Sequence, residues 1–452
     1  MPARLIESLA TTEALADLFS DESLLQAALD FESALARAQA RLGLVPQAAA
    51  RAISKAAKAK NFDAGALSRE SARGATLGLP LSKALSQCVA AADAEAARFV
   101  HWGATSQDVA DTALVLLLKQ AQPILMADLT RIEKSLFKLS EANKKSAMLG
   151  RTLLQPAPPV TFGLKAAGWL AAIRRSRERL EAAFADSLIV QLGGASGTLA
   201  SMGSEGPALM KILAEELGLG CPVAPWHTER DRLAALVCAC GVLTGALGKM
   251  ARDISLLTQA EVAEAAERGG EGRGASSTMP HKQNPTGCVL TLAAANRVPG
   301  LVASYLSAMV QEHERAAGGW QSEWPTMASI VQATGLATAS MAQVARNLVV
   351  HPKKMRANIE GTQGVVFSER AMMLLSASLE REAARKMLES AVKRTRAQGK
   401  HLREVLAQTP QVTSKIERSV LKRLEVPEQY LGSAEEFRQA LISAAKQNKN
   451  KK

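Results

Sequence analysis

The stretch from Asp231 to Met250 reads DRLAALVCACGVLTGALGKM and indicates the kind of fold that this chain forms. Its larger apolar residues recur every three or four positions, which is the spacing of one face of an α-helix. They are Leu233, Leu236, Val237, Cys240, Leu243, Leu247 and Met250. Alanines between them let such a helix pack against neighbours on several sides. Because alternating strand patterns are nearly absent, the sequence predicts an all-α fold of long, packed helices.

Stretches without proline extend this prediction over most of the chain; they cover residues 81–122, 160–206, 226–279 and 353–409. A chain of 452 residues is long enough for several domains. We predict three helical domains: an N-terminal domain over 1–110, a central bundle of long helices over 111–350 and a C-terminal domain over 351–452. A cap at Ser20 is expected before a helix from about Ser23 to Leu42.

Composition narrows the function classes. Hydrophobic residues make up 47% of the chain and charged residues 22%, as in an ordinary globular protein. The net charge of +12 would suit nucleic acid, an anionic membrane or an anionic metabolite. Basic residues are spread along the helical stretches, and the longest apolar run, Leu233 to Gly248, is short for a membrane span. These patterns favour a polyanionic metabolite and predict neither a nucleic-acid nor a membrane partner.

Cysteine and histidine positions bear on location and cofactors. The five cysteines form no C-x-x-C pair, and the N-terminus lacks the pattern of a secretory signal. Reduced thiols in a cytoplasmic protein are therefore expected. The histidines lack the spacing of a metal-ligand motif, so neither a metal nor an organic cofactor is expected.

The run from Gly269 to Pro285, GGEGRGASSTMPHKQNP, carries the clearest chemical signal. Its glycines restrict the backbone little, whereas the Met-Pro pair before Lys282 stiffens the chain again. Such a segment can form a flap that brings the hydroxyl of Ser276 or Ser277 beside a fixed cation, which is useful for proton transfer. The alternative is an exposed glycine-rich loop. The glycine spacing excludes a phosphate-binding loop.

Three further segments combine short polar side chains with turn residues. They are His101 to Asp108 (HWGATSQD), Gly150 to Pro159 (GRTLLQPAPP) and Gln311 to Arg315 (QEHER). The first can present hydroxyls and backbone N–H groups to an anion at a helix start near Val109. Taken singly, the three also fit a plain helix cap, an inter-helix turn and an exposed helix end.

Together, the four segments resemble in order and spacing the active-site regions of the fumarase/aspartase superfamily, whose signature is similar to Ser276-Ser-x-Met-Pro-x-Lys-x-Asn284. Two other segments, QLGGASG from Gln191 and PWHTERDR from Pro225, make the chain most similar to the branch of bacterial 3-carboxy-cis,cis-muconate cycloisomerases. The resemblance implies a homotetramer with a twenty-helix core and active sites that are each built from three subunits.

The resemblance also implies roles for individual residues. Ser276 would exchange a proton with the substrate, and Lys282 with Asn284 would stabilise an aci-carboxylate carbanion. A tricarboxylate would be converted to a lactone in aromatic catabolism. The residues implied to bind the substrate are His101, Thr105, Ser106, Gln107, Thr152, Gln155, His227, Ser277, Met279, Asn284, His313 and Arg315.

Two departures from the superfamily pattern guide the choice of reaction. Elimination lyases carry a histidine after the threonine that corresponds to Thr152, and a glutamate seven residues after the signature lysine. Here these positions are Leu153 and Val289. Their loss favours a cycloisomerase over an adenylosuccinate lyase-like elimination, because a carboxylate leaving group needs no general acid. Ala275 replaces a glycine that is usual in the flap. The alternative outside enzymes is a basic, non-catalytic scaffold that binds nucleic acid.

Overall fold

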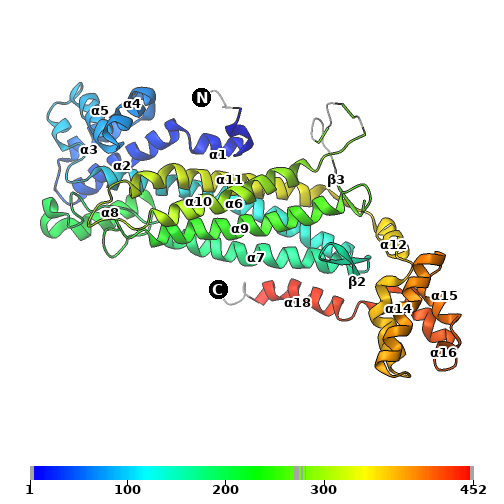
Figure 1. Cartoon of the computed structure of the whole chain (residues 1–452). Helices are drawn as coiled ribbons and strands as arrows, with labels where there is room; N and C mark the ends of the chain where they lie inside the picture. Colours follow the sequence, from blue (N-terminus) through cyan, green and yellow to red (C-terminus); the bar gives the residue numbers. More distant parts are fainter. Residues whose placement is uncertain (1–4, 269–273, 276–277, 280, 448–452) are drawn as a thin grey trace. The chain divides into compact units, whose positions relative to one another are not determined.

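The computed structural model describes residues 5–268, 274–275, 278–279 and 281–447, and it is mostly helical (Figure 1). Helices hold 70% of the residues, with 18 α-helices in the described part of the chain. The prediction of a helical fold is therefore confirmed. Within the described residues, two small two-stranded sheets accompany the helices.

The chain divides into two compact units, each assembled from three separate parts of the sequence. The first comprises Met1–Leu129, Ser176–Gly248 and Leu290–Ser340, and the second comprises Thr130–Arg175, Lys249–Val289 and Met341–Lys452. Five long helices contribute to both units: α6 (Ser106–Ala142), α7 (Phe162–Ser187), α9 (Asp231–Leu257), α10 (Thr286–Ser307) and α11 (Gly319–Asn347). This division does not test the domains 1–110, 111–350 and 351–452, which stay a prediction.

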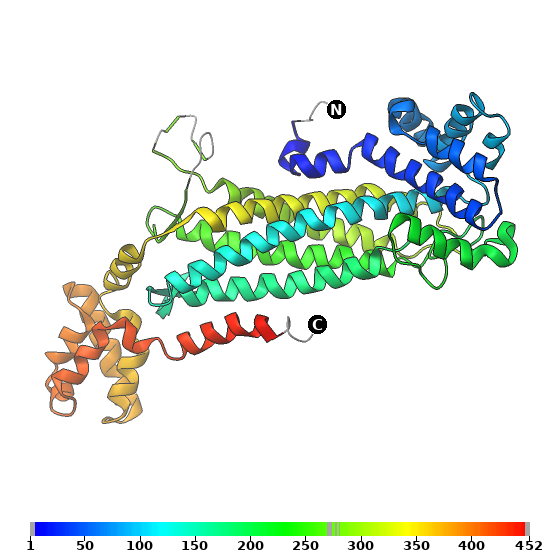
Figure 2. The ribbon, with the colours of Figure 1, turned by 180° about the vertical axis from the view of Figure 1, so that it is seen from behind.

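In the first unit, segments of the long helices run side by side, as two opposite views show (Figures 1 and 2). The apolar residues that predict α9 are at most 1% exposed, so the helical spacing identified the buried face correctly. Ser20 caps α2 by accepting the N–H of Ser23 at 3.3 Å, as predicted. The shorter helices of this unit are α1 (Glu13–Leu18), α2 (Asp21–Arg41), α3 (Gln47–Ala56), α4 (Ala64–Gly74), α5 (Gly78–Ala90) and α8 (Gly206–Leu217).

Three prolines lie inside long helices rather than between them. Pro123, Pro299 and Pro325 lie inside α6, α10 and α11. A proline in a helix interior removes one hydrogen bond and costs about 3 kcal/mol. Long helices can tolerate that cost because packing of their apolar faces, rather than local propensity, supplies most of their stability.

A β-hairpin replaces the inter-helix turn that was one interpretation of residues 150–159. Strands β1 (Ala147–Thr152) and β2 (Gln155–Thr161) pair antiparallel, with Thr152 opposite Gln155. The two-residue loop between them, Leu153-Leu154, has φ angles of 48° and 65°. Two positive φ angles are those of a type I′ turn, which usually carries Asn or Gly. The leucine side chains are 97% and 75% exposed in the single chain.

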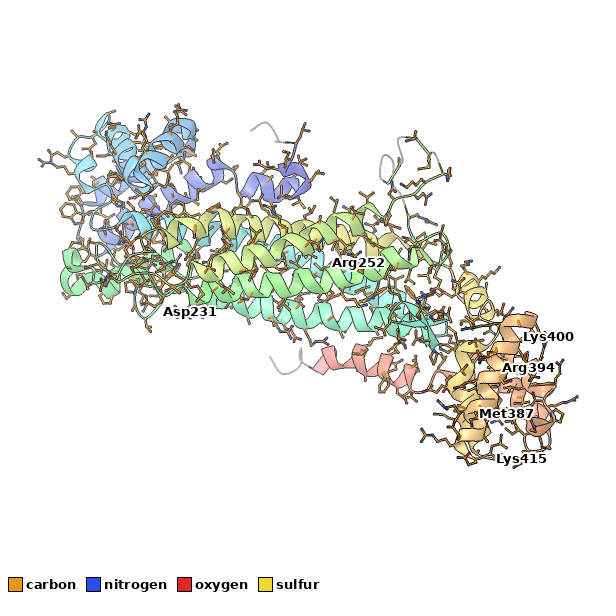
Figure 3. The ribbon with its side chains drawn as sticks, viewed as in Figure 1. Asp231, Arg252, Met387, Arg394, Lys400 and Lys415 are labelled. Atoms are coloured by element: carbon orange, nitrogen blue, oxygen red, sulfur yellow. The ribbon has the colours of Figure 1, made fainter. Side chains whose placement is uncertain are left out.

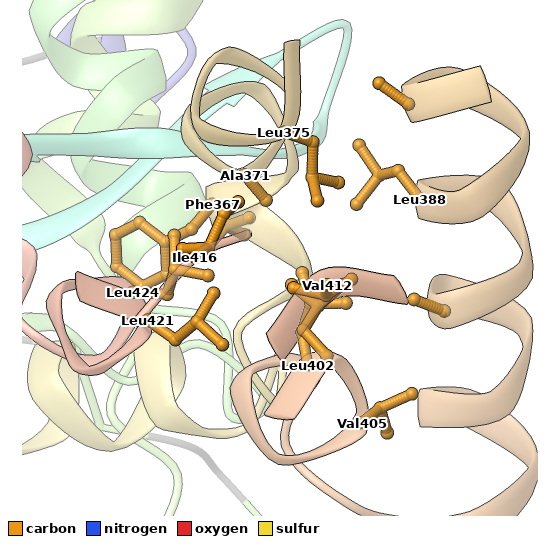
Figure 4. Packing of buried hydrophobic residues seen from close by; sticks show 14 of the residues in the cluster. Phe367, Ala371, Leu375, Leu388, Leu402, Val405, Val412, Ile416, Leu421 and Leu424 are labelled. Atoms are coloured by element: carbon orange, nitrogen blue, oxygen red, sulfur yellow. The ribbon is translucent and has the colours of Figure 1, made fainter. Parts of the chain in front are cut away.

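The C-terminal part of the second unit has a compact core of its own (Figure 4). Phe367, Leu375, Leu388 and Val405 from successive helices meet there with Leu149 of β1. Figure 3 shows the side chains of this region, with Met387 and Arg394 labelled on α14. The remaining elements are β3 (Ala265–Glu267), β4 (Leu348–Val350), α12 (Pro352–Glu360), α13 (Ser368–Ser376), α14 (Arg381–Gln398), α15 (Leu402–Ala407), α16 (Pro410–Thr413), α17 (Arg418–Leu421) and α18 (Ala434–Gln447).

Candidate active site

The first unit brings a fixed cation to the N-terminus of α6. Helix α6 begins at Ser106, one turn earlier than predicted, and the preceding Thr105 donates its backbone N–H to Asp108 at 3.0 Å. The guanidinium of Arg315 donates to the Thr105 hydroxyl at 2.7 Å and to the carbonyl of Ala195 at 3.0 Å. A helix N-terminus offers free N–H groups and a positive dipole end. Together with Arg315 it forms a suitable place for a carboxylate.

Asp108 ties the loops of this region together. Its buried carboxylate accepts the backbone N–H groups of Gly193 and Gly194 at 2.9 and 3.0 Å, besides that of Thr105. Nε2 of His227 lies 2.7 Å from the same carboxylate. In the sequence, Asp108 is only the last residue of the segment from His101, and no pattern there indicates this role. Three distant segments are therefore fixed around one charge, and the predicted residue His227 is one of its partners.

Gly193 lies where a side chain would collide with His227. A Cβ at this position would be 2.6 Å from Cε1 of His227 and 2.8 Å from Cβ of Pro225. We expect Gly193→Ala to push His227 away from Asp108, to destabilise the protein by about 1–3 kcal/mol and to raise KM. Thermal unfolding and steady-state kinetics measure both effects. Gly168→Ala in α7, where a Cβ meets nothing within 4 Å, is the control; equal behaviour of the two variants would contradict this account.

A buried cluster of charges lies around Arg230, and no sequence pattern indicated it. Arg230 makes paired contacts with Asp111 at 2.8 and 3.0 Å and with Glu323 at 2.6 and 3.0 Å. The side chains of all three are fully buried. Burial disfavours the charge on Arg230, but the two carboxylates hold the pKa of its guanidinium above the ordinary value. The arginine therefore stays protonated.

Neutral donors compensate the second carboxylate of this cluster. Tyr305 and Gln311 donate to Glu323 at 3.0 and 2.7 Å, while Trp320 donates to Asp111 at 2.9 Å. Burial nevertheless raises the pKa of Glu323, because these dipoles stabilise its charge less than water would. The cluster anchors α6, α10 and α11 to the residue that precedes α9, all within the first unit. It also holds Gln311, which begins the segment that ends at Arg315.

The other predicted residues of the first unit lie in different surroundings. Gln107 is fully buried, and its amide donates to Asp111 at 3.1 Å and to the carbonyl of His227 at 2.7 Å. His101 pairs with Glu32 through Nδ1 at 2.6 Å. His313 is exposed and has a positive φ of 45°. The structure thus places Thr105, Ser106 and Arg315 at one surface, with Gln107 behind it.

The second unit holds the described part of the signature segment. The predicted residues Ser276 and Ser277 lie outside the described residues. Asn284 donates its backbone N–H to the carbonyl of Gly274 at 2.9 Å, and Lys282 and Met279 are exposed between these two points. Gly274 has a φ of 74°, and a Cβ there would lie 2.7 Å from the carbonyl oxygen of Asn284. A glycine is therefore required where the two ends of the segment meet.

The predicted residues Thr152 and Gln155 face solvent at the end of the β1–β2 hairpin. A partly buried ion pair supports this hairpin near its turn, since Arg151 donates to both oxygens of Glu264 at 2.9 and 2.8 Å. Asn358 of α12 donates to the same carboxylate at 2.8 Å. Glu264 precedes β3, which leads into the signature segment, so it connects two predicted parts of the site.

Leu153 and Val289 stand where elimination lyases carry a histidine and a glutamate. Both residues are apolar and lie on the surface of the single chain. Leu153 is 97% exposed and Val289 is 55% exposed. Neither side chain can donate or accept a proton. The described residues of the second unit thus keep Lys282 and Asn284 but have no histidine after Thr152.

Comparisons with known proteins show the family of the chain. Residues 8–300 match the family described as lyase, and residues 364–441 match the C-terminus of adenylosuccinate lyase. The chain belongs to the lyase family of the fumarase/aspartase superfamily.

Individual relatives and a solved structure show which enzymes of this family the chain is similar to. The 3-carboxy-cis,cis-muconate cycloisomerase of Bradyrhizobium diazoefficiens is 44% identical over 97% of this chain and 98% of that protein. The crystal structure of the 3-carboxy-cis,cis-muconate lactonizing enzyme from Pseudomonas putida superposes with a TM-score of 0.92 at 41% identity, covering 98% of this chain and 99% of that one. A nitrosuccinate lyase of Streptomyces davaonensis is 41% identical over 92% of this chain and 89% of that protein.

Proposed function

We propose that this protein is a 3-carboxy-cis,cis-muconate cycloisomerase, which forms 4-carboxymuconolactone in the protocatechuate branch of the β-ketoadipate pathway. Several cycloisomerases of this specificity are 39–44% identical over nearly the full chain. The structural observation that carries the proposal is the solvent-exposed Leu153 after Thr152. An addition whose reverse expels a carboxylate needs no acid at that position, whereas expulsion of an amine does.

The reaction consists of an intramolecular addition. One terminal carboxylate oxygen bonds to the distal double bond, and the π electrons move to the carbon next to the other terminal carboxylate. Negative charge spreads into that carboxylate, and a proton then completes the lactone. We propose that Ser276 supplies the proton and that Lys282 and Asn284 stabilise the charge that develops.

The substrate carboxylates need fixed positive partners. We propose that Arg315 and the N-terminus of α6, with Thr105 and Ser106, bind one of them. Arg315 is held in place by the hydroxyl of Thr105 and the carbonyl of Ala195, so its orientation is set before the substrate arrives. Because Arg315 loses little conformational entropy on binding, its contact with a substrate carboxylate is stronger. Such fixed positive groups favour a polyanion. His101, Gln107, Thr152, Gln155, His227, Ser277, Met279 and His313 remain proposed substrate-binding residues.

We also propose that the protein is a homotetramer in the cytoplasm, with sites shared by three subunits. The support is α10, whose most apolar 18-residue window is only 22% buried in the single chain, against 61% for α6 and α9. Apolar helix faces that a single chain leaves exposed mark interfaces. Sedimentation equilibrium should give four times the chain mass of 47.8 kDa; a monomer at micromolar concentration would refute the proposal.

The first experiment is an ultraviolet assay of the purified protein with 3-carboxy-cis,cis-muconate. Loss of diene absorbance with formation of the lactone is the expected result. The similarity to a nitrosuccinate lyase makes elimination the second candidate, so fumarate formation from nitrosuccinate and from adenylosuccinate is measured in parallel. Fumarate without lactone would replace the proposed reaction with an elimination.

A further inference from the structure

Helix α2 contributes two buried polar side chains to the turn that carries His101. Glu32 is 1% exposed, and its Oε1 lies 2.6 Å from Nδ1 of His101. Gln39, two helical turns further along α2, donates to the carbonyl of Trp102 at 2.6 Å. His101 has a positive φ of 57°, which is uncommon for a residue with a side chain. These two contacts therefore fix the turn to α2.

Two carboxylate–imidazole pairs lie in the first unit, but their carboxylates are compensated differently. Asp108, which pairs with His227, also accepts three backbone N–H groups. Glu32 has His101 as its partner, and its second oxygen is buried without a hydrogen bond among the described residues. A buried carboxylate that lacks other donors needs a cation beside it. Among the described residues His101 is the hydrogen-bond partner of Glu32, so its imidazolium can serve as that cation.

The state of the ring decides what its outer nitrogen can do. While Glu32 accepts from Nδ1, that nitrogen carries a proton, so Nε2 is protonated only when the ring is cationic. Nε2 of His101 has no hydrogen-bond partner among the described residues, and the side chain is 18% exposed. A cationic ring therefore presents an N–H donor to a ligand. A neutral ring presents a lone pair instead, which repels a carboxylate.

We propose that Glu32 is a positioning residue that holds His101 as an imidazolium, so that the Nε2–H of His101 binds a carboxylate of the substrate. This inference rests on the proposed function, since it assigns a partner to one carboxylate of a polycarboxylate. Glu32 itself touches no substrate. Its role is to set both the orientation of the ring and the charge that the ring carries.

The charges around His101 make the proposed binding of a substrate carboxylate depend on pH. The charged groups that act on His101 are Glu32 from α2 and Asp108 from α6. Burial lowers the pKa of His101, but the charge and hydrogen bond of Glu32, with the charge of Asp108, raise it above the ordinary value overall. Carboxylate binding is thus complete below that raised pKa and is lost as the pH rises through it.

The test compares wild type with Glu32→Gln, which keeps an acceptor for Nδ1–H but removes the charge. We expect the alkaline limb of kcat/KM to move to lower pH and KM at pH 8 to rise roughly tenfold, because a charge-assisted hydrogen bond is lost. The value of kcat should change less than about threefold, and Glu32→Asp should restore part of the shift. Asp30→Asn, an exposed acid on the same helix, is the control.

A second experiment separates this inference from the proposed function. Calorimetry over the same pH range measures the affinity for propane-1,2,3-tricarboxylate, which is unreactive. A pH-dependent affinity that Glu32→Gln shifts supports the role of Glu32 even if the muconate is not turned over. Unchanged pH profiles for both binding and kinetics would overturn it. If Glu32→Gln does not fold, His101→Gln, which has no ionisable ring, should bind the tricarboxylate more weakly and without this pH dependence; wild-type affinity in that variant would equally overturn the proposal.

Discussion

Replacement of Arg230 by methionine is expected to destabilise the protein by about 3–5 kcal/mol, because it leaves two buried carboxylates without their cation. Arg230 is fully buried and contacts both Asp111 and Glu323 through paired hydrogen bonds. Methionine has a similar length and keeps the packing, so the loss reports on charge rather than on a cavity. Denaturant midpoints at equal protein concentration measure the change, since subunit association adds to apparent stability.

The chain offers a matched control two residues away. Arg232 contacts Asp186 at 3.3 Å, and that aspartate side chain is 62% exposed. Arg232→Met should therefore cost roughly 0–1 kcal/mol. Adding Asp111→Asn and Glu323→Gln to Arg230→Met should recover most of the lost stability, because the unpaired charges disappear with the arginine. A small effect of Arg230→Met alone, or no recovery in the triple variant, would show that the cluster is not under this electrostatic constraint.

Loss of Ser276 is expected to reduce kcat by about 10²–10⁴-fold, the usual contribution of a positioned proton-transfer group. Lys282→Ala should reduce kcat by roughly 10²–10³-fold, since it removes a cation aimed at charge that exists only in the transition state. Affinity for propane-1,2,3-tricarboxylate should persist in Ser276→Ala, because the proposed carboxylate contacts remain. Stopped assays with the muconate measure the rates, and calorimetry measures the affinity.

Lys211→Ala provides the control for Lys282→Ala, since Lys211 is an exposed lysine of α8. Its removal tests whether the net positive charge alone accounts for any loss. Equal rates in Lys211→Ala and Lys282→Ala would argue against a specific role for Lys282. Full activity in Ser276→Ala would require another proton donor and would reject the proposed mechanism.

Much of the fold and part of the site could be predicted from the sequence. The spacing of Leu236, Cys240, Leu243 and Leu247 identified α9 and its buried face, because helical periodicity is a local property. The resemblance selected Thr105, Ser106 and Arg315, which the structure brings together at the start of α6. It also selected Lys282 and Asn284 of the second unit. The roles of all these residues stay predictions until the variants are measured.

The β1–β2 hairpin was determined by tertiary contacts rather than by local signals. Its turn residues, Leu153 and Leu154, have positive φ angles that leucine seldom adopts, so the sequence carried no signature of a two-residue hairpin turn. Pairing of the flanking strands and the Arg151–Glu264 ion pair support this conformation. Long-range contacts can stabilise a backbone conformation that local propensity disfavours.

By itself, therefore, the sequence determined the helices, the buried face of α9 and the family of the signature segment, since each depends on spacing along the chain. Only the tertiary structure decided which cation lies beside each buried carboxylate. Glu32 and His101 are 69 residues apart, and Arg230 and Asp111 are 119 apart. No periodicity connects such pairs. They form because a buried charge must find a partner wherever the packed helices bring one within reach.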